Sequence, residues 1–187
     1  LTNGSKVALC AFVCCAVSIV PAALGALVAQ YAFGATFHRA FMSWYIADSL
    51  GLLVITPAIL LVKQGPRPFE TEPTADALAR HSLLLFGISL IVFVQGLAPL
   101  LFLLIPVCVL IAFRLGQRYA AMATLWLTAV SLVSTYQGWG PAALMADFDT
   151  RLWTVQLFCF VNLLTSLGVA AELSEREALK AELERVS

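Results

Sequence analysis

Charged residues are scarce in this chain. They make up 12% of its 187 residues, whereas 61% are hydrophobic, and the mean hydropathy of +0.92 exceeds what a soluble globule can bury. Eleven Lys and Arg residues balance eleven Asp and Glu residues, so neither a basic surplus nor an acidic surplus is present. The composition therefore predicts a single domain in a lipid bilayer and gives no indication of a nucleic-acid partner.

Recognisable catalytic motifs are missing as well. The chain has no Gly-rich phosphate loop, no His-x-x-x-His pair, no G-x-S-x-G turn and no paired C-x-x-C. The two histidines, His38 and His81, are expected on opposite membrane faces, where they cannot share a metal. Cys10 and Cys14 share a helical face, but apolar surroundings favour an inert thiol. We expect no catalytic residue, metal or cofactor in this segment.

The chain contains repeated apolar stretches of about 20 residues, separated by charged residues or by Gly and Pro. This is the length of helix that crosses about 30 Å of hydrocarbon. These stretches predict an all-α, polytopic transmembrane bundle of about six spans. The region Ser82–Phe113 is long for one crossing and short for two, and we expect a tight turn at Gly96–Pro99. The six predicted spans are Val7–Tyr31, Trp44–Val62, Ser82–Gln95, Leu97–Phe113, Tyr119–Tyr136 and Leu152–Ala171.

Basic residues predict the orientation, because short cytoplasmic loops are enriched in Lys and Arg. With the C-terminus inside, only Arg39 and Arg151 lie outside, whereas nine basic residues lie inside. The inner set is Lys6, Lys63, Arg67, Arg80, Arg114, Arg118, Arg176, Lys180 and Arg185. We therefore predict a multi-pass membrane protein with a cytoplasmic C-terminus. Since the chain begins at Leu1 and ends inside a charged helical pattern, we interpret it as part of a longer protein.

Asp48 is the costliest residue to place, because a carboxylate within a span needs protein or water beside it. Helical spacing aligns it with Trp44, Leu52, Ile55 and Ile59, a stripe expected to face the bundle. Four hydroxyl residues, Thr124, Thr128, Ser131 and Thr135, share a face of the fifth span, where they either join helices or line a wet cavity.

Several polar residues gather in the outer half of the predicted spans. We hypothesise that they surround a pocket open to the outside, with Arg151 as the counter-ion of Asp48. Ordinary interhelical hydrogen bonding is the alternative. The ligand-pocket candidates are Trp44, Asp48, Gln95, Thr135, Arg151 and Gln156, with Gln30 and Gln137 nearby.

Small residues and prolines shape the first two spans. The pairs Ala22/Ala26 and Gly25/Ala29 permit a close neighbouring helix. Proline inside a helix removes a backbone hydrogen bond, so kinks are expected at Pro21 and at Pro57.

After Ala171 the sequence changes to ELSEREALKAELERVS, which has no Pro or Gly to end a helix. We divide the chain into a transmembrane domain, 1–171, and a signalling helix, 172–187. Leu179 and Leu183 fit the a and d positions of a heptad, which favours a parallel homodimer through a coiled coil. A solvated amphipathic tail is the alternative.

These residues resemble the bacterial membrane-associated sensor domain called MASE-one. The resemblance runs over about residues 10 to 185 and lies in three segments. The matching positions are Trp44, Asp48, Gly51 and Pro57 in SWYIADSLGLLVITPAILL, Pro106, Arg114 and Gly116 in PVCVLIAFRLGQRYAA, and Arg151, Gln156 and the exit helix. The usual domain of this family has further spans before this region, so we expect a partial domain.

The resemblance implies a sensory input domain in the bacterial inner membrane that detects an unknown small molecule. Its output would be a diguanylate cyclase, a phosphodiesterase or a histidine kinase of a two-component system. It implies that Trp44 and Asp48 line a pocket and that Pro57 and Arg114 have structural or signalling roles. Two alternatives remain open: the substrate-binding component of a vitamin-type importer, and a dimerisation anchor with no ligand.

Overall fold

The computed structural model describes residues 4–65, 72–95 and 100–186. Within these ranges the chain forms six α-helices and two short 3-10 helices, η1 (Leu100–Leu103) and η2 (Pro141–Leu144), and no strand. The α-helices are α1 (Gly4–Phe33), α2 (Phe37–Gln64), α3 (Ala75–Val94), α4 (Leu104–Leu115), α5 (Gln117–Tyr136) and α6 (Phe148–Val186). The predicted all-α bundle of apolar helices is confirmed.

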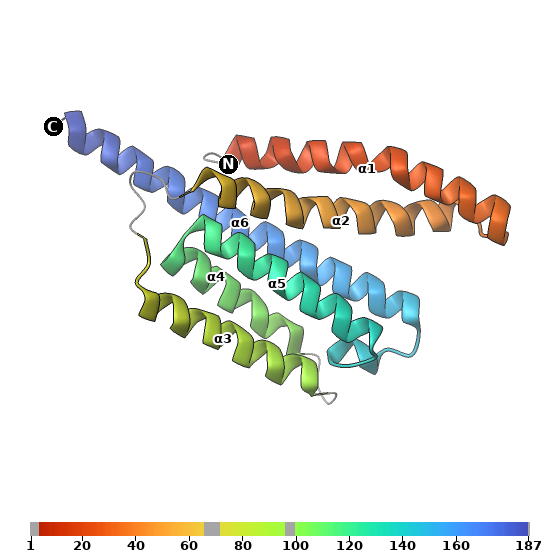
Figure 1. The fold of residues 1–187 in the computed structure, drawn as a ribbon. Helices are drawn as coiled ribbons and strands as arrows, with labels where there is room; N and C mark the ends of the chain where they lie inside the picture. Colours follow the sequence, from red (N-terminus) through yellow and green to blue (C-terminus); the bar gives the residue numbers. More distant parts are fainter. Residues whose placement is uncertain (1–3, 66–71, 96–99, 187) are drawn as a thin grey trace.

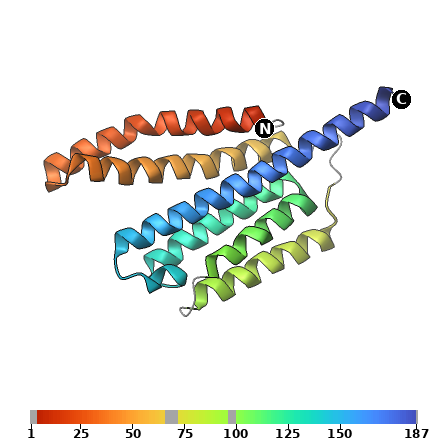
Figure 2. The same cartoon turned by 180° about the vertical axis from the view of Figure 1, so that it is seen from behind.

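The six helices run alternately in opposite directions, so the bundle has two distinct ends (Figures 1 and 2). At one end, which we call the exit end, lie the start of α1, the end of α2, the α4–α5 turn and the departing part of α6. At the other, the cleft end, lie the α1–α2 and α5–α6 connections. The exit end carries Lys6, Lys63, Arg80, Arg114, Arg118, Arg176 and Lys180; the cleft end carries Arg39 and Arg151.

Five of the described helices are long and apolar enough to cross a membrane, and α4 is the short one. Its 12 residues span about 18 Å, and η1 lengthens it at the cleft end. The tight turn predicted at Gly96–Pro99 lies outside the described residues. Helix α3 begins at Ala75, before the predicted span start at Ser82, because the Thr74 hydroxyl accepts a hydrogen bond from the Ala77 amide (3.2 Å) and caps the helix there.

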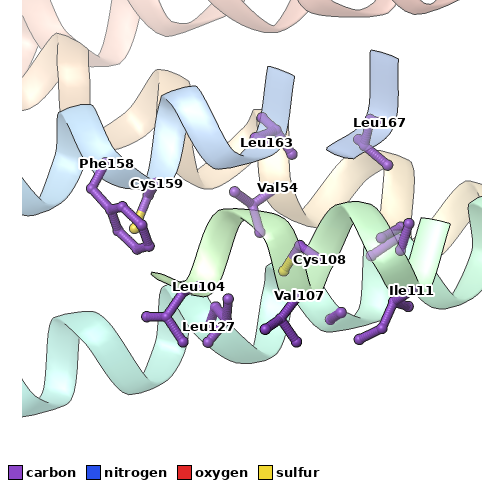
Figure 3. Packing of buried hydrophobic residues seen from close by; sticks show 14 of the residues in the cluster. Val54, Leu104, Val107, Cys108, Ile111, Leu127, Phe158, Cys159, Leu163 and Leu167 are labelled. Carbon is purple, nitrogen blue, oxygen red and sulfur yellow. The ribbon is translucent and has the colours of Figure 1, made fainter. Parts of the chain in front are cut away.

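The core lies where α2, α4, α5 and α6 meet. Figure 3 shows side chains from all four helices converging, including Val54, Cys108, Leu127 and Leu163. The hydroxyl row of α5 is also buried here, with Thr124 and Thr135 donating to carbonyls one turn earlier (2.9 and 2.7 Å). The row therefore packs between helices, as one of its two interpretations proposed.

Helix α1 packs mainly on α2, and the two form a hairpin along one side of the bundle (Figure 1). Ala22 and Ala26 are fully buried in this contact. At Gly25 an added Cβ would lie only 3.0 to 3.3 Å from the ring of Trp44, so the indole rests directly on the glycine. The predicted close approach at small residues of α1 is confirmed.

The predicted inward stripe on α2 is wrong. Leu52, Ile55 and Ile59 are 37%, 47% and 50% exposed, and Trp44 is half exposed. The buried face is instead Ser49, Leu50, Leu53, Val54, Pro57, Ala58 and Leu61. In a bilayer a large apolar side chain is as stable against lipid as against protein, so hydrophobic spacing alone does not identify the packed face.

Candidate functional site

Two adjoining cavities lie between α2 and α6 at the cleft end; together we call them the α2–α6 cleft. The outer cavity, about 480 Å³, has walls from the α1–α2 turn and the first turns of α2 and α6, including Thr36, Arg39, Ser43 and Asp149. The deep cavity, about 310 Å³, lies further along both helices, with Tyr45, Ser49, Leu53 and Phe160 in its walls. Trp153 and Gln156 of α6 line both cavities. Volumes of this size suit small-molecule ligands.

Asp147 fixes the start of α6, and thereby one wall of the cleft. Its carboxylate accepts hydrogen bonds from the Thr150 amide and the Thr150 hydroxyl, both at 3.0 Å. These bonds, together with the nearby Arg39 and Arg151 guanidiniums, hold the pKa of Asp147 below its usual value. From this cap, residues 149, 153, 156 and 160 recur at helical spacing and present one face of α6 to the cleft.

An ion pair closes the outer cavity on one side. The Arg39 guanidinium donates to the Asp149 carboxylate, which joins the first turn of α2 to the first turn of α6. Both side chains are exposed, at 80% and 50%, so solvent screening limits the pair to about 1 kcal/mol or less. The mouth of the cleft thus carries one positive and one negative side chain. Because their ion pair contributes little stability, little free energy is needed to separate them.

Unpaired polar groups lie deeper in the cleft. Ser49 is 7% exposed, and its hydroxyl has no hydrogen-bond partner among the described residues. Gln156 is 6% exposed, and no hydrogen bond to its side chain occurs within the described part of the chain. The remaining walls of the deep cavity are mostly apolar, so Ser49 and Gln156, together with Tyr45, are the polar residues that a bound molecule would meet there.

Of the six predicted pocket residues, Gln156 lines the cleft. Trp44 lies against Gly25 in the α1–α2 contact, and Asp48, one turn further on, is half-buried. The buried Thr135 bonds to its own helix, and the Gln95 amide donates to the Val92 carbonyl at the end of α3 (3.3 Å). The structure therefore distributes these residues over several contacts and does not gather them around one cavity.

The predicted pairing of Arg151 with Asp48 is wrong. The Arg151 Nε donates to the Met145 carbonyl (2.5 Å), and no ion pair within the described ranges includes Asp48. This bond ties Arg151 to the loop before α6. The cleft pair, Arg39 and Asp149, was missed by sequence reasoning. Opposite charges at the starts of two predicted spans were the available signal, but sequence alone does not bring those starts together.

The residues predicted for signalling lie toward the exit end. Pro57 is buried within α2 and lines a cavity of about 280 Å³ between α1, α2 and α6. Arg114, at the end of α4, is exposed and lines a smaller cavity of about 190 Å³ beside α6. Leu179 and Leu183 are 55% and 70% exposed on the part of α6 that has left the bundle.

Comparison with known proteins gives one family. The family model named MASE1 matches residues 3–177, which is nearly the whole chain. Neither the curated proteins nor the solved structures contain a match. The match covers every helix of the bundle and the first part of α6 beyond it, so this chain belongs to the MASE1 family of membrane-associated sensory domains.

Proposed function

We propose that this chain detects a small molecule in the α2–α6 cleft and transmits the signal through α6 to a cytoplasmic output module. The observation that carries this proposal is the continuity of α6. The same helix lines the cleft through Trp153 and Gln156 and then continues to Val186. Its 39 residues extend about 58 Å, roughly twice the thickness of the hydrocarbon core.

The charge distribution supports an orientation with the exit end in the cytoplasm of a bacterial inner membrane. Eight basic residues of the described helices lie in the elements at the exit end, with Arg185 near the end of α6, and two lie in those at the cleft end. Short cytoplasmic segments carry such an excess of Lys and Arg. The cleft would then open on the outer side, where it meets molecules that have not crossed the membrane.

The exposed leucines of the exit helix support a homodimer. Leu179 and Leu183 are four residues apart and exposed on a segment that has no packing partner among the described residues. A second copy of the helix would bury them in a parallel coiled coil. The output that the family resemblance implies, a diguanylate cyclase, a phosphodiesterase or a histidine kinase, would lie beyond this coiled coil.

Signal transmission would rest on the boundary between the hairpin and α6. A ligand in the cleft contacts α2 on one side and α6 on the other, and it stabilises whichever relative position of the two helices it fits better. Because the Arg39–Asp149 pair contributes little stability, it presents a small barrier to that adjustment. A rotation or shift of α6 at the cleft is carried along the helix to its far end.

An insertion series tests the transmission directly. We would fuse a diguanylate cyclase module, active only as a correctly aligned dimer, after Ser187, and insert one to seven alanines after Lys180. Each inserted residue rotates the fused module by about 100° relative to the bundle, whereas seven restore the heptad register. We expect cyclic-di-GMP production to vary at least about fivefold across one to six insertions and to return at seven.

Substitution in the cleft provides the second arm of this experiment. Gln156→Leu removes the amide that lines both cavities and should change the output of the fusion at least about threefold. Val161→Leu, on an exposed face of the same helix, is the matched control and should leave output unchanged. Output that is independent of both insertion length and the cleft substitution would contradict the sensory proposal and favour a passive anchor.

A further inference from the structure

We propose that the α2–α6 cleft binds a medium-chain amphiphile with a carboxylate at one end and a hydrogen-bonding oxygen near the other. This inference rests on the proposed function, since it names the ligand class of the same site. Three features of the cleft support it: a charged mouth, an apolar depth, and unpaired polar side chains within that depth.

The charged residues at the mouth of the cleft favour a ligand with a carboxylate head group. Arg39 is four-fifths exposed, and its partner Asp149 is half exposed, so the guanidinium is accessible to a competing anion. A ligand carboxylate can accept two parallel N–H bonds from an arginine, an arrangement that combines charge with geometry. The exchange of one carboxylate for another leaves the arginine paired. It releases Asp149, and with it the link between α2 and α6.

The apolar walls of the deep cavity favour an apolar chain in the ligand. Below the shared residues Trp153 and Gln156, the walls are formed by Leu50, Leu53, Leu157 and Phe160. Such a surface binds an alkyl or isoprenoid chain through burial of apolar area. A short polar molecule such as a sugar would fill the outer cavity but leave the deep cavity without a suitable occupant.

The distance between Arg39 at the mouth and Ser49 in the deep cavity indicates the length of the ligand. Arg39 and Ser49 are ten residues apart in α2, which corresponds to about 15 Å along the helix axis. An extended chain of about twelve carbon atoms covers that distance, at about 1.3 Å per bond along its axis. A molecule of this size reaches the Ser49 level while its head remains at the mouth.

The far end of the ligand should carry oxygen. Ser49 lines the deep cavity with a hydroxyl that is buried and unpaired among the described residues, and a plain methyl terminus would leave it so. A ligand hydroxyl or carbonyl there would satisfy the Ser49 hydroxyl. Gln156, which lines both cavities, can bond an oxygen higher in the chain.

Two probes that differ by one oxygen atom test this inference. We would titrate 12-hydroxydodecanoate and dodecanoate into the chain in nanodiscs of phosphatidylcholine and follow tryptophan fluorescence. Trp153 lines both cavities, so Trp153→Phe should remove the saturable signal. We expect the hydroxy acid to bind about two- to tenfold more tightly, the range for one neutral hydrogen bond.

Matched serine variants identify the origin of this preference. Ser49→Ala should abolish it, whereas Ser89→Ala should retain it, because Ser89 is also buried but bonds to the Leu85 carbonyl of α3, away from the cleft. Arg39→Gln should weaken both probes by a similar factor, about fivefold or more, because both share the carboxylate.

Three results would overturn the inference: equal affinity for the two probes in the unmodified chain, a hydroxyl preference that survives Ser49→Ala, or no saturable binding of either probe. None of them bears on the sensory proposal itself. That proposal is judged by the insertion series in α6, which requires no ligand.

Discussion

The α1–α2 hairpin and the α5–α6 pair are both built from helices apolar enough to cross a membrane, yet they pack differently. In the most apolar stretch of α1, 17% of residues are buried inside the protein, against 50% in those of α5 and α6. The less apolar helices are therefore the better buried ones. Small and hydroxyl side chains, such as Thr124, Ser131 and Ser166, let these helices approach closely, whereas the large side chains of α1 face outward toward lipid.

This difference places the cleft at a mechanical boundary. The hairpin is held internally by tight contacts such as that of Trp44 on Gly25. Near its tip, the Arg39–Asp149 pair is its polar link to α6. A ligand between the hairpin and α6 therefore binds where little free energy is needed to move one helix relative to the other. Substitutions in the hairpin, in the core and at the link between them can test this division, beginning with the largest expected effect.

Gly140→Ala should be the most damaging single change. Gly140 has φ of +77°, and an added Cβ would lie 3.1 to 3.2 Å from side-chain and backbone atoms of Phe93, which cannot easily yield. The conformational strain and the collision together should cost about 3 kcal/mol. We expect the Tm in detergent to fall by about 5–10 °C.

Gly34→Ala is its control in the hairpin. Gly34 has a similar φ of +68°, but nothing lies within 4 Å of its added Cβ, so only the conformational strain of about 1 kcal/mol remains. If both substitutions lower Tm equally, contact with Phe93 is not what distinguishes the α5–α6 connection from the hairpin turn.

Gly25→Ala should loosen the hairpin without loosening the core. Its Cβ would meet the Trp44 ring at about 3.0 Å, and displacing the indole should cost about 1 kcal/mol. Amide hydrogen exchange should accelerate in α1 and remain unchanged in α5. Trp44→Leu in the same chain should restore slow exchange. Equal acceleration in both helices would mean that the hairpin and the core open as one unit.

Much of this architecture could be predicted from the sequence. Apolar stretches and basic residues identified the helices and their alternation, because the bilayer restricts spanning structures to a few. Helix faces could not be predicted in the same way. Ile55 and Val54 are adjacent and similarly apolar, yet Ile55 is 47% exposed and Val54 is 3% exposed, since lipid and protein accept either side chain.

The site was less predictable than the fold. Gln156 was identified as a polar residue in an apolar span, but its neighbours in the cleft come from α2, more than 100 residues earlier. Arg151 and Asp48 have the charges and the depth of a plausible pair. Arg151 instead donates a local hydrogen bond to the Met145 carbonyl, and the periodicity of the sequence does not predict such a bond.

Thr128→Val tests whether the buried hydroxyls of the core serve only packing. Thr128 is buried, and its hydroxyl has no partner among the described residues, so the nearly isosteric valine should leave Tm unchanged or raise it slightly. Thr124→Val should instead cost about 0.5 kcal/mol, because it loses a bond to the Ala120 carbonyl. A marked loss of stability in Thr128→Val would indicate that the hydroxyl is bonded in the membrane.

The smallest interaction energy is expected at the link between the two regions. Arg39→Gln, Asp149→Asn and the double variant form a cycle whose coupling energy should be a few tenths of a kcal/mol, because both partners are exposed. The coupling should fall further when salt is raised from about 0.05 to about 0.5 M, since screening weakens exposed pairs. Tm measured across the cycle checks both points. A coupling above about 2 kcal/mol that is insensitive to salt would mean that the hairpin is locked to α6, and the cleft would then not be the compliant boundary inferred from the packing.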